Sequence, residues 1–490
     1  MTDRRGYFTA DQVRAAEAEL FTRVPAGMPM RRAAHGLATV VAGELRARTG
    51  GVAGRAVGLL VGSGDNGGDA LWAGAFLRRR GVAVVAVLLN PERAHREGLA
   101  ALRAAGGRVV DGRESVDGVL ARLDGVDLVL DGIVGISGRG PLRPGAADIV
   151  AGVDVPVVAV DLPSGVDPDT GAVDGPAVRA EVTVTFGAYK PVHVLAAPRC
   201  GRIVLVPIGL QLPEPDLVQW EPAAIGAGWP VPGAADDKYS QGVVGVCAGS
   251  AKYPGAGVLC AGAAVAATSG LVRYVGDDAE VLARFPEVIA GKKISETGRV
   301  QAWVFGPGAG TDGEARDRLA EVLASDLPVL VDADGLTILA DEPQLVRGRT
   351  APTVLTPHAG EFARLTGAAP GDDRVGAVRR LADDWQVTVL LKGRATIIAT
   401  PGAPTAVNEA GGSWAATAGA GDVLSGILGA LLAAGRAPEW AAAAAARVHA
   451  LAANLAAYDD QPAAAPISAS PLLEHIRAAV RVVREMGERR

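Results

Sequence analysis

A glycine-rich segment directly before an acidic residue is the part of the sequence that most clearly indicates chemistry. Residues 413–426 read Ser-Trp-Ala-Ala-Thr-Ala-Gly-Ala-Gly-Asp-Val-Leu-Ser-Gly, and the pattern predicts a helix over 417–434. The first N–H groups of a helix are unpaired and positively polarised, so Gly419, Ala420 and Gly421 would leave room for a phosphate. A carboxylate beside such a site, here Asp422, suits activation of a hydroxyl for phosphoryl transfer. The alternative is a glycine-rich turn whose acidic residue only favours the helix start.

Four further segments of small or polar residues each follow an apolar run that predicts a strand. They are residues 249–256, 306–310, 356–361 and 392–396. Taken singly, His358 is better explained as a hydrogen-bonding residue at a helix start, and Lys392 as a solvated surface lysine. Ligands in open α/β sheets bind at the carboxyl ends of strands, so we expect these segments and 419–422 to surround one ligand.

The first half of the chain has a second glycine-rich segment, after a strand predicted over 56–61. Gly62, Gly64 and Gly67 have the spacing of a dinucleotide-binding loop, in the required context between a strand and a helix. The next strand ends without the acidic residue that a dehydrogenase uses to hold ribose, and two carboxylates, Asp65 and Asp69, lie in the segment itself. We therefore favour a segment that binds a cation or a substrate over one that binds NAD.

Two later strand ends offer partners for that segment. Asp131 begins the glycine-rich stretch 131–140, and Asp161 and Ser164 follow the strand predicted over 155–160. Asn66, Asp131 and Ser164 offer only oxygen ligands with little charge, which suits a weakly held monovalent cation better than zinc. For each residue alone, turn capping is the alternative.

The elements that must position these residues form two alternating series of strands and helices. Between the series, residues 211–237 contain five prolines and two tryptophans without periodicity, which predicts an interdomain linker. The fold class is therefore α/β in two domains. We expect an N-terminal Rossmann-like three-layer domain over 1–215 and a C-terminal α/β/α domain over 225–490.

Composition limits the classes of partner. The 490 residues carry a net charge of −6, which gives no attraction to nucleic acid or to anionic membranes. The start of the chain lacks a signal-peptide pattern, and no run of about 20 apolar residues is present. Cys200, Cys247 and Cys260 show no metal-ligand spacing and suit a reducing compartment. We expect a cytoplasmic homo-oligomer that acts on small molecules.

The first half resembles the N-terminal domain of the NAD(P)H-hydrate repair proteins, an epimerase of YjeF type. The resemblance rests on residues 66–69, 131–141, 161–165 and 186–191. It implies potassium held by Asn66, Asp131 and Ser164, proton transfer by Asp161, and substrate orientation by Lys190. It further implies that NADHX and NADPHX, the hydrates, are bound by Asp65, Asn66, Gly67, Gly68, Asp69, Gly135, Ile136, Ser137, Gly138, Arg139, Gly140, Pro141 and Asp161. Asp65 and Ala70 depart from the Asn and Gly usual in the family.

The second half resembles the ribokinase-like superfamily, and within it the ADP- or ATP-dependent NAD(P)H-hydrate dehydratases. The match is carried by residues 356–358, Lys392-Gly393, Asn408 and 419–426. It implies that the hydrate is contacted by Ala256, Gly308, His358 and Asp422. It also implies that ADP is held by Lys392, Gly393, Arg394, Ala395, Thr396 and Gly421, with Mg²⁺.

The expected reaction begins when Asp422 accepts the proton of the C6 hydroxyl, so that the alkoxide attacks the terminal phosphoryl group of ADP. The ring nitrogen then expels phosphate, giving NAD(P)H and AMP. The Gly-Ala-Gly-Asp sequence is nearer to the general sugar-kinase form, since the dehydratases more often have Gly at 418 and Thr at 420. A small-molecule kinase fused to a Rossmann-like domain, and a dehydratase with an inactive regulatory N-terminal half, therefore remain alternatives.

Overall fold

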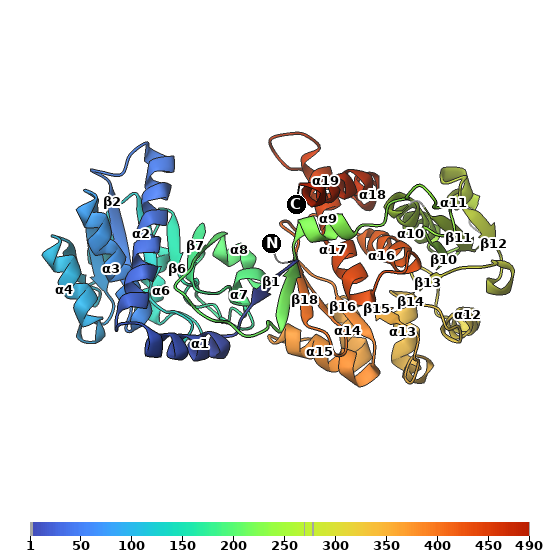
Figure 1. Cartoon of the computed structure of the whole chain (residues 1–490), viewed down its shortest axis with the longest axis horizontal. Coiled ribbons are helices and arrows are strands. Elements are labelled where there is room, and N and C mark those ends of the chain that lie inside the picture. The colour runs from blue at the N-terminus through green and yellow to red at the C-terminus, as the bar shows by residue number, and fades with distance from the viewer. Residues whose placement is uncertain (1–2, 269, 277–278, 490) are drawn as a thin grey trace. The chain divides into compact units, whose positions relative to one another are not determined.

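The computed structural model describes residues 3–268, 270–276 and 279–489. The chain forms two units, Gly6–Asp216 and Leu217–Arg490 together with Met1–Arg5. We call them the N-terminal unit and the C-terminal unit. Each contains its own β-sheet with helices packed against it (Figure 1), which confirms the prediction of two α/β domains.

The N-terminal unit is built on seven strands, and every neighbouring pair is parallel. Their order across the sheet is β4-β3-β2-β5-β6-β7-β8, so the chain runs from β2 to one edge and then returns to β5. Ligands of open parallel sheets bind where the strand order reverses, here beside the carboxyl ends of β2 and β5. The strands are β2 (Ala56–Val61), β3 (Ala83–Leu88), β4 (Arg108–Asp111), β5 (Leu128–Gly132), β6 (Val157–Val160), β7 (Val182–Phe186) and β8 (Arg202–Val206).

Both faces of this sheet are covered by helices, as a parallel sheet requires. One core joins the strands to α2 (Met28–Thr49), α3 (Asp65–Arg79) and α4 (Arg96–Ala104). The core on the other face joins them to α5 (Val116–Leu123) and α6 (Pro144–Ala151). Because helices cover both faces of the sheet, the polar residues gather at the edge where the strands end.

The C-terminal unit contains an eleven-stranded sheet in the order β1-β9-β18-β17-β16-β15-β14-β13-β10-β11-β12. The strands from β12 to β16 pair in parallel, and β17 pairs antiparallel with both β16 and β18. The strand bounds are β1 (Arg4–Tyr7), β9 (Leu217–Trp220), β10 (Val243–Cys247), β11 (Leu271–Val275), β12 (Ile289–Gly291), β13 (Ala302–Phe305), β14 (Val329–Val331), β15 (Thr353–Leu355), β16 (Thr388–Leu391), β17 (Ala395–Ala399) and β18 (Thr405–Glu409).

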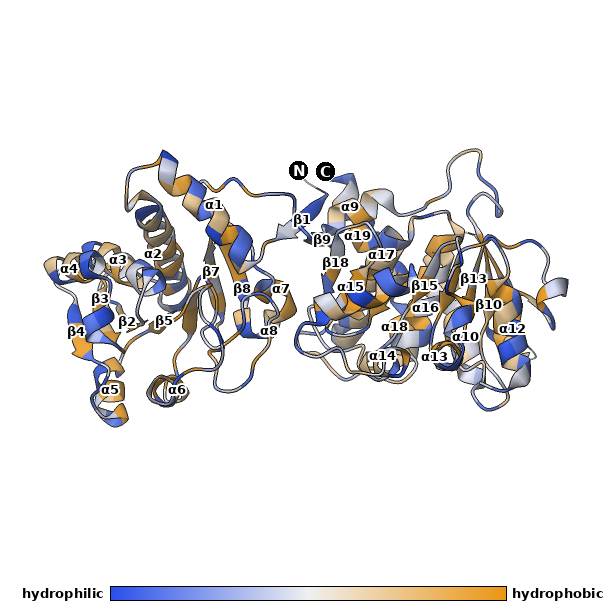
Figure 2. Ribbon diagram, turned by 90° about the horizontal axis from the view of Figure 1, so that it is seen from below, coloured by the Kyte–Doolittle hydropathy of each residue, from blue (hydrophilic) through white to orange (hydrophobic). Residues whose placement is uncertain are grey.

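One large apolar core joins this sheet to α10 (Pro254–Ala267), α16 (Ala420–Ala433) and α17 (Pro438–Tyr458). Hydrophobic residues run along the central strands of the unit, as Figure 2 shows for β10 and β13. α16 packs against both strands and is buried over most of its length, so its N-terminus is held at a fixed place on the sheet.

The prediction of an interdomain linker over 211–237 is wrong for the central part of this segment, which forms a strand and a helix. β9 pairs in parallel with β18, and α9 (Pro222–Gly228) packs so closely on α19 (Ile476–Glu488) that a Cβ on Gly226 would lie 1.7 Å from the Val483 carbonyl oxygen. The division between the two units falls between residues 216 and 217. The sequence predicted domains over 1–215 and 225–490.

Within the described ranges, no helix is long and apolar enough to cross a membrane. Cys200, Cys247 and Cys260 are free and buried. Burial raises the pKa of the Cys200 and Cys247 thiols to about 12, so these two are inert packing residues.

Candidate active sites

The glycines after β2 serve a close approach between backbones. A Cβ on Gly62 would lie 1.8 Å from the carbonyl oxygen of Ile133, just after β5. A Cβ on Gly67 would lie 2.4 Å from the carbonyl oxygen of Gly62, and one on Gly68 would lie 2.9 Å from the ring of His95. The spacing that resembles a dinucleotide fingerprint therefore brings the first turns of α3 against the carboxyl end of β5.

Asp131 and Ser164 form a buried hydrogen-bonded pair at this sheet edge. The Ser164 hydroxyl donates to Asp131 Oδ1 over 2.7 Å, and the Ser164 N–H donates to Oδ2 over 2.8 Å. Asn66 lies nearby, since a Cβ on Gly135, in the segment that follows β5, would lie 3.3 Å from Asn66 Cγ. The Nδ2 atom of Asn66 is buried without a hydrogen-bond partner in the described part of the chain.

Burial raises the pKa of Asp131 to about 6, although hydrogen bonds from Ser164 and Ile133 work in the opposite direction. A cation beside this carboxylate would relieve the cost of burying its charge. One carboxylate with neutral oxygen donors fits a monovalent cation. Across the described residues, no group of three His, Cys, Asp or Glu side chains could hold a metal ion.

Asp161 is the centre of a second buried network. It has a left-handed backbone conformation (φ 68°), and its Oδ1 accepts from Lys190 Nζ over 2.5 Å and from Thr185 Oγ1 over 3.0 Å. Lys190 is 1% exposed. His193 Nδ1 accepts from the Lys190 N–H, so its Nε2 donates to the Asp161 carbonyl oxygen. Burial lowers the pKa of His193 to about 4, so this histidine is neutral at physiological pH.

Three further carboxylates, Asp65, Asp69 and Glu17, lie close enough to the Asp161 network to interact with it electrostatically. Burial, followed by the charges of Asp161 and Asp65, raises the pKa of Asp69 well above its usual value. Asp69 Oδ1 is buried without a partner among the described residues. Burial and the charge of Asp161 also raise the pKa of Glu17, on α1 (Ala10–Arg23). Glu17 is not among the residues predicted from the sequence, although it follows Val13 by four residues and precedes Leu20 by three, on the buried side of α1.

The segment 135–141, predicted to bind substrate, follows β5; Gly135, Ile136 and Gly138 are partly exposed, and Ser137 and residues 139–141 are exposed. Its arginine is already paired: Arg139 Nη2 lies 3.0 Å from Asp169 Oδ2, and Nε lies 3.4 Å from Asp167 Oδ2. Pro141 lies against the turn at Gly175, whose Cβ would be 2.9 Å from the proline ring. Binding of the nucleotide by these residues remains a prediction.

Asp422 lies in the first turn of α16, in the C-terminal unit, after the left-handed Gly419. Burial, and next the charge of Asp332, raises the pKa of Asp422 to about 7. His449 of α17 is partly buried, and its Nε2 lies 2.8 Å from the Ala420 carbonyl oxygen. Because burial lowers the pKa of His449 to about 4, it is neutral and ties α17 to the start of α16.

Lys392 follows β16 and is held by two carboxylates. Its Nζ lies 2.8 Å from Asp332 Oδ1 and 3.5 Å from Glu361 Oε2. Burial lowers the pKa of Lys392, but the charges of Asp332 and Glu361 outweigh it, so the pKa is raised. A Cβ on Gly421 would lie 3.4 Å from Lys392 Nζ. The alternative of a solvated surface lysine is therefore wrong, and the ammonium group lies beside the N-terminus of α16.

The other predicted residues of this site fall in three places. Ala256 and Gly308 lie together, since a Cβ on Gly308 would be 2.8 Å from that of Ala256. His358 caps α14 (Ala359–Thr366): its Nδ1 accepts from the Gly360 N–H over 2.9 Å, while Glu361 accepts from the His358 N–H. This is the helix-start role considered above, and contact with substrate stays a prediction.

The hairpin of β16 and β17 carries Gly393, Arg394, Ala395 and Thr396. Arg394 pairs with Glu409 of the neighbouring strand β18, with 3.0 Å between Nη2 and Oε1. The Thr396 hydroxyl donates to the Gly393 carbonyl oxygen over 2.9 Å. Asn408 is buried and donates to the Ala446 carbonyl oxygen. These contacts fix the hairpin, so the nucleotide contacts assigned to it are still predictions.

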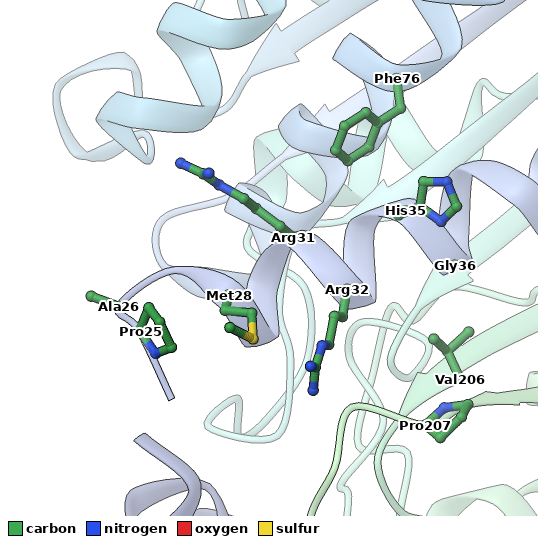
Figure 3. A pocket seen from close by; sticks show the side chains of 10 residues that line it. All are labelled: Pro25, Ala26, Met28, Arg31, Arg32, His35, Gly36, Phe76, Val206 and Pro207. Carbon is green, nitrogen blue, oxygen red and sulfur yellow. The ribbon is translucent and has the colours of Figure 1, made fainter. Parts of the chain in front are cut away.

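A cavity of about 730 Å³ in the N-terminal unit shares no residue with either site. Figure 3 shows its lining, which joins basic and apolar side chains from α2 with others from α3 and the end of β8. The residues are Pro25, Ala26, Met28, Arg31, Arg32, His35, Gly36, Phe76, Val206 and Pro207.

Two family models match the two units separately. The family described as YjeF-related protein N-terminus matches residues 27–192, and the family described as NAD(P)H-hydrate dehydratase matches residues 244–474. The chain is 62% identical to the bifunctional NAD(P)H-hydrate repair enzyme Nnr of Mycobacterium tuberculosis (strain ATCC 25618 / H37Rv), over 97% of this chain and 99% of the relative. It is 60% identical, with the same coverage, to the enzyme of that name from Mycobacterium leprae (strain TN).

Among solved structures, the chain is similar to an ADP/ATP-dependent NAD(P)H-hydrate dehydratase from Bacillus subtilis, co-crystallised with ATP and Mg²⁺. The two are 25% identical, with a TM-score of 0.48, and the match covers 54% of this chain and 98% of that one.

Proposed function

The chain belongs to the family of bifunctional NAD(P)H-hydrate repair enzymes, and from this premise we propose which site performs each half of the repair. The N-terminal unit carries the NAD(P)H-hydrate epimerase and the C-terminal unit the NAD(P)H-hydrate dehydratase. The observation that supports this division is that each unit matches its own family model and contains its own ion pair of an aspartate and a lysine, buried in the N-terminal unit and partly buried in the C-terminal unit.

In the epimerase site, we assign proton transfer to Asp161. Its carboxylate is held by Lys190 and Thr185, which fix one oxygen and leave the other for a substrate proton. Asp65–Asp69 and 135–141 surround the nucleotide, and Asp131, Ser164 and Asn66 hold potassium. When bound, the cation neutralises the Asp131 carboxylate and fixes the adjoining turns.

In the dehydratase site, Asp422 accepts the proton of the C6 hydroxyl, and the oxygen attacks the terminal phosphoryl group of ADP. The N–H groups at the start of α16 and the Lys392 ammonium stabilise the charge that develops. The ring nitrogen's lone pair then breaks the C6–O bond, phosphate leaves, and a proton is lost to give NAD(P)H. The products are AMP and phosphate.

Magnesium is expected with the nucleotide. Asp332 is committed to Lys392 and Ser425, and the described residues contain no cluster of three ligating side chains. That suits a Mg²⁺ ion that arrives with the phosphates rather than one held in a protein cage. It would neutralise phosphate charge. Three buried free cysteines fit a cytoplasmic enzyme, and a homo-oligomeric state stays a proposal for light scattering to test.

Mixed R and S epimers of NADHX with ADP test the proposal. We expect complete recovery of NADH from both epimers by the wild-type enzyme. Asp422→Asn should lose dehydration by about 100-fold or more while retaining epimer exchange, because the base alone is removed. Asp161→Asn should do the reverse, and asparagine tolerates the left-handed backbone at this position.

Loss of both activities in either variant contradicts the two-site division. A stable phosphorylated product would instead support the small-molecule kinase that the Gly-Ala-Gly-Asp sequence resembles. Recovery from the S epimer only would show that the N-terminal unit lacks epimerase activity.

A further inference from the structure

Asp332 is a buried carboxylate in the C-terminal unit to which no role has been assigned. It follows β14 directly and is 1% exposed. Its Oδ1 accepts from Lys392 Nζ over 2.8 Å, and its Oδ2 accepts from the Ser425 hydroxyl of α16 over 2.7 Å. Both oxygens are therefore engaged, and Asp332 links β14, β16 and the second turn of α16.

The turn that carries Asp332 is tightly constrained. A Cβ on Gly306, which has φ 125°, would lie 1.9 Å from the Asp332 carbonyl oxygen. Ala333 has φ 49° and ψ −113°, a sparsely populated conformation that costs a non-glycine residue about 1–3 kcal/mol and persists only where surrounding contacts enforce it. Asp334 accepts from the Gly310 N–H over 2.9 Å and anchors the other end of the turn. The fold thus holds Asp332 in one place.

Asp332 holds the ammonium group of Lys392, which has a flexible side chain. Lysine has a four-carbon stem and loses considerable rotamer freedom when it is fixed at one point. A Cβ on Gly421 would lie 3.4 Å from Lys392 Nζ and 3.8 Å from Asp332 Oδ2. The Asp332–Lys392 pair therefore lies against the backbone N–H groups that start α16, where the terminal phosphoryl group is expected.

We propose that Asp332 is a positioning residue for the dehydratase reaction, which holds the Lys392 ammonium at the phosphoryl-binding N-terminus of α16. This inference rests on the proposed function. Glu361, at 3.5 Å from Lys392 Nζ, is the weaker of the two holders, because it also caps α14.

The negative charge of Asp332 also acts on Asp422, the proposed base. After burial, Asp332 is the largest influence that raises the pKa of Asp422, while Lys392 lowers it and Asp334 and Glu361 raise it. Removing the negative charge of Asp332 should lower the pKa of Asp422, and removing the positive charge of Lys392 should raise it. The two variants are thus expected to move the acidic limb of the pH profile in opposite directions.

The first test uses the full chain with Asp332→Asn, which keeps the size and the hydrogen bond from Ser425 but removes the charge. We expect a loss of about 10- to 100-fold in the rate of ADP-dependent NADHX dehydration, typical of a charge-assisted hydrogen bond. Epimerase activity in the same polypeptide should stay at the wild-type level, which controls for folding. The acidic limb should move to lower pH, a shift that a merely structural role would not produce.

A double-mutant cycle with Lys392→Met tests whether Asp332 acts through Lys392. The double variant should be no slower than Lys392→Met alone, because the group that Asp332 positions is already absent. Asp334→Asn is the matched control: it removes the same charge from the same turn without touching Lys392, so its effect should add to that of Lys392→Met. Additive effects of Asp332→Asn and Lys392→Met would overturn the inference.

Two outcomes separate the inference from the function on which it rests. If the wild-type enzyme does not dehydrate NADHX with ADP, the proposed function fails first. If it does, and Asp332→Asn is within twofold of wild type, only the inference fails.

A second variant covers the case in which Asp332→Asn does not fold. Ser425→Ala removes the other contact of Asp332 and is expected to give a smaller loss of dehydration, which disappears in the Lys392→Met background. The inference would be overturned if Ser425→Ala caused no loss of dehydration. It would also be overturned if the loss caused by Ser425→Ala persisted in the Lys392→Met background.

Discussion

The protonation of Asp422, the proposed base, should set the pH range of dehydration. Burial and the Asp332 carboxylate raise its pKa to about 7, and a base must be ionised to accept the C6 hydroxyl proton. As the pH falls through about 7, Asp422 binds a proton and activity is lost. We expect kcat/KM for dehydration to fall about tenfold per pH unit on the acidic side. Measurement from pH 5.5 to 8.5 checks this, and a flat profile would contradict the assignment.

The oxygen cluster of Asp131, Ser164 and Asn66 should respond to potassium. The cation relieves the buried Asp131 charge, so it should stabilise the folded N-terminal unit. At ten times the dissociation constant the expected gain is about 1.4 kcal/mol, measured as a higher melting temperature in potassium than in tetramethylammonium chloride at equal ionic strength. Ser164→Ala should lose the response, and Ser115→Ala, an N-cap serine on α5, should retain it. An unchanged response in Ser164→Ala would exclude this site.

At the scale of elements, the contact between the ends of β2 and β5 has no room for a side chain. A Cβ on Gly62 would lie 1.8 Å from the Ile133 carbonyl oxygen, and this obstacle is backbone that cannot move aside. Gly62→Ala should destabilise the N-terminal unit by about 3 kcal/mol or more and abolish epimerase activity, as judged by chemical denaturation and epimer exchange.

The matched control is Gly145→Ala in α6, where a Cβ would meet nothing within 4 Å. Gly145 is the second residue of α6, and alanine has less conformational freedom to lose on folding than glycine, so this variant should be neutral or more stable by up to about 1 kcal/mol. Equal stability of the two variants would contradict the steric argument.

At the scale of the whole molecule, the first residues of the chain stabilise the unit formed by its last part. Arg4 stacks on Trp220, Arg5 pairs with Glu221, and the Glu221 N–H donates to the Asp3 carbonyl oxygen. Deletion of residues 2–5 should therefore lower the stability of the C-terminal unit by about 1 kcal/mol or more, because it removes one cation–π contact, one exposed ion pair and half of the edge strand β1.

Tryptophan fluorescence can separate the two units in that experiment. Of the seven tryptophans, Trp72 lies in the N-terminal unit and the others lie in the C-terminal unit. The deletion should lower the fluorescence midpoint while epimerase activity stays at the wild-type level. A loss of epimerase activity without a change in fluorescence would show that these residues act on the other unit.

The sequence carried enough information for the two α/β domains and for the residues at the strand ends. Alternating apolar runs predict parallel strands, and ligand-binding residues of such sheets gather at the carboxyl ends, so Asp131, Asp161 and Lys392 could be found from their position at or just after the end of a strand. The prediction from the sequence is wrong for residues 217–228, because prolines and the shortness of the four-residue strand β9 obscure the periodicity of β9 and α9.

Glu17, Asp332 and Ser425 show what the sequence could not give. Each becomes part of a site only through a partner more than fifty residues away, as with Ser425 and Asp332 or Asp332 and Lys392. Whether a lysine is solvated or held by two carboxylates depends on burial and on distances of a few ångströms, which residue types do not encode locally. The glycine-rich segment 413–426 illustrates both what the sequence predicts and what only the tertiary structure decides. The sequence alone predicted a phosphate site with an acidic neighbour at Gly419–Asp422, whereas only the tertiary structure placed Lys392 beside Gly421 and, through burial and Asp332, raised the pKa of Asp422 to about 7.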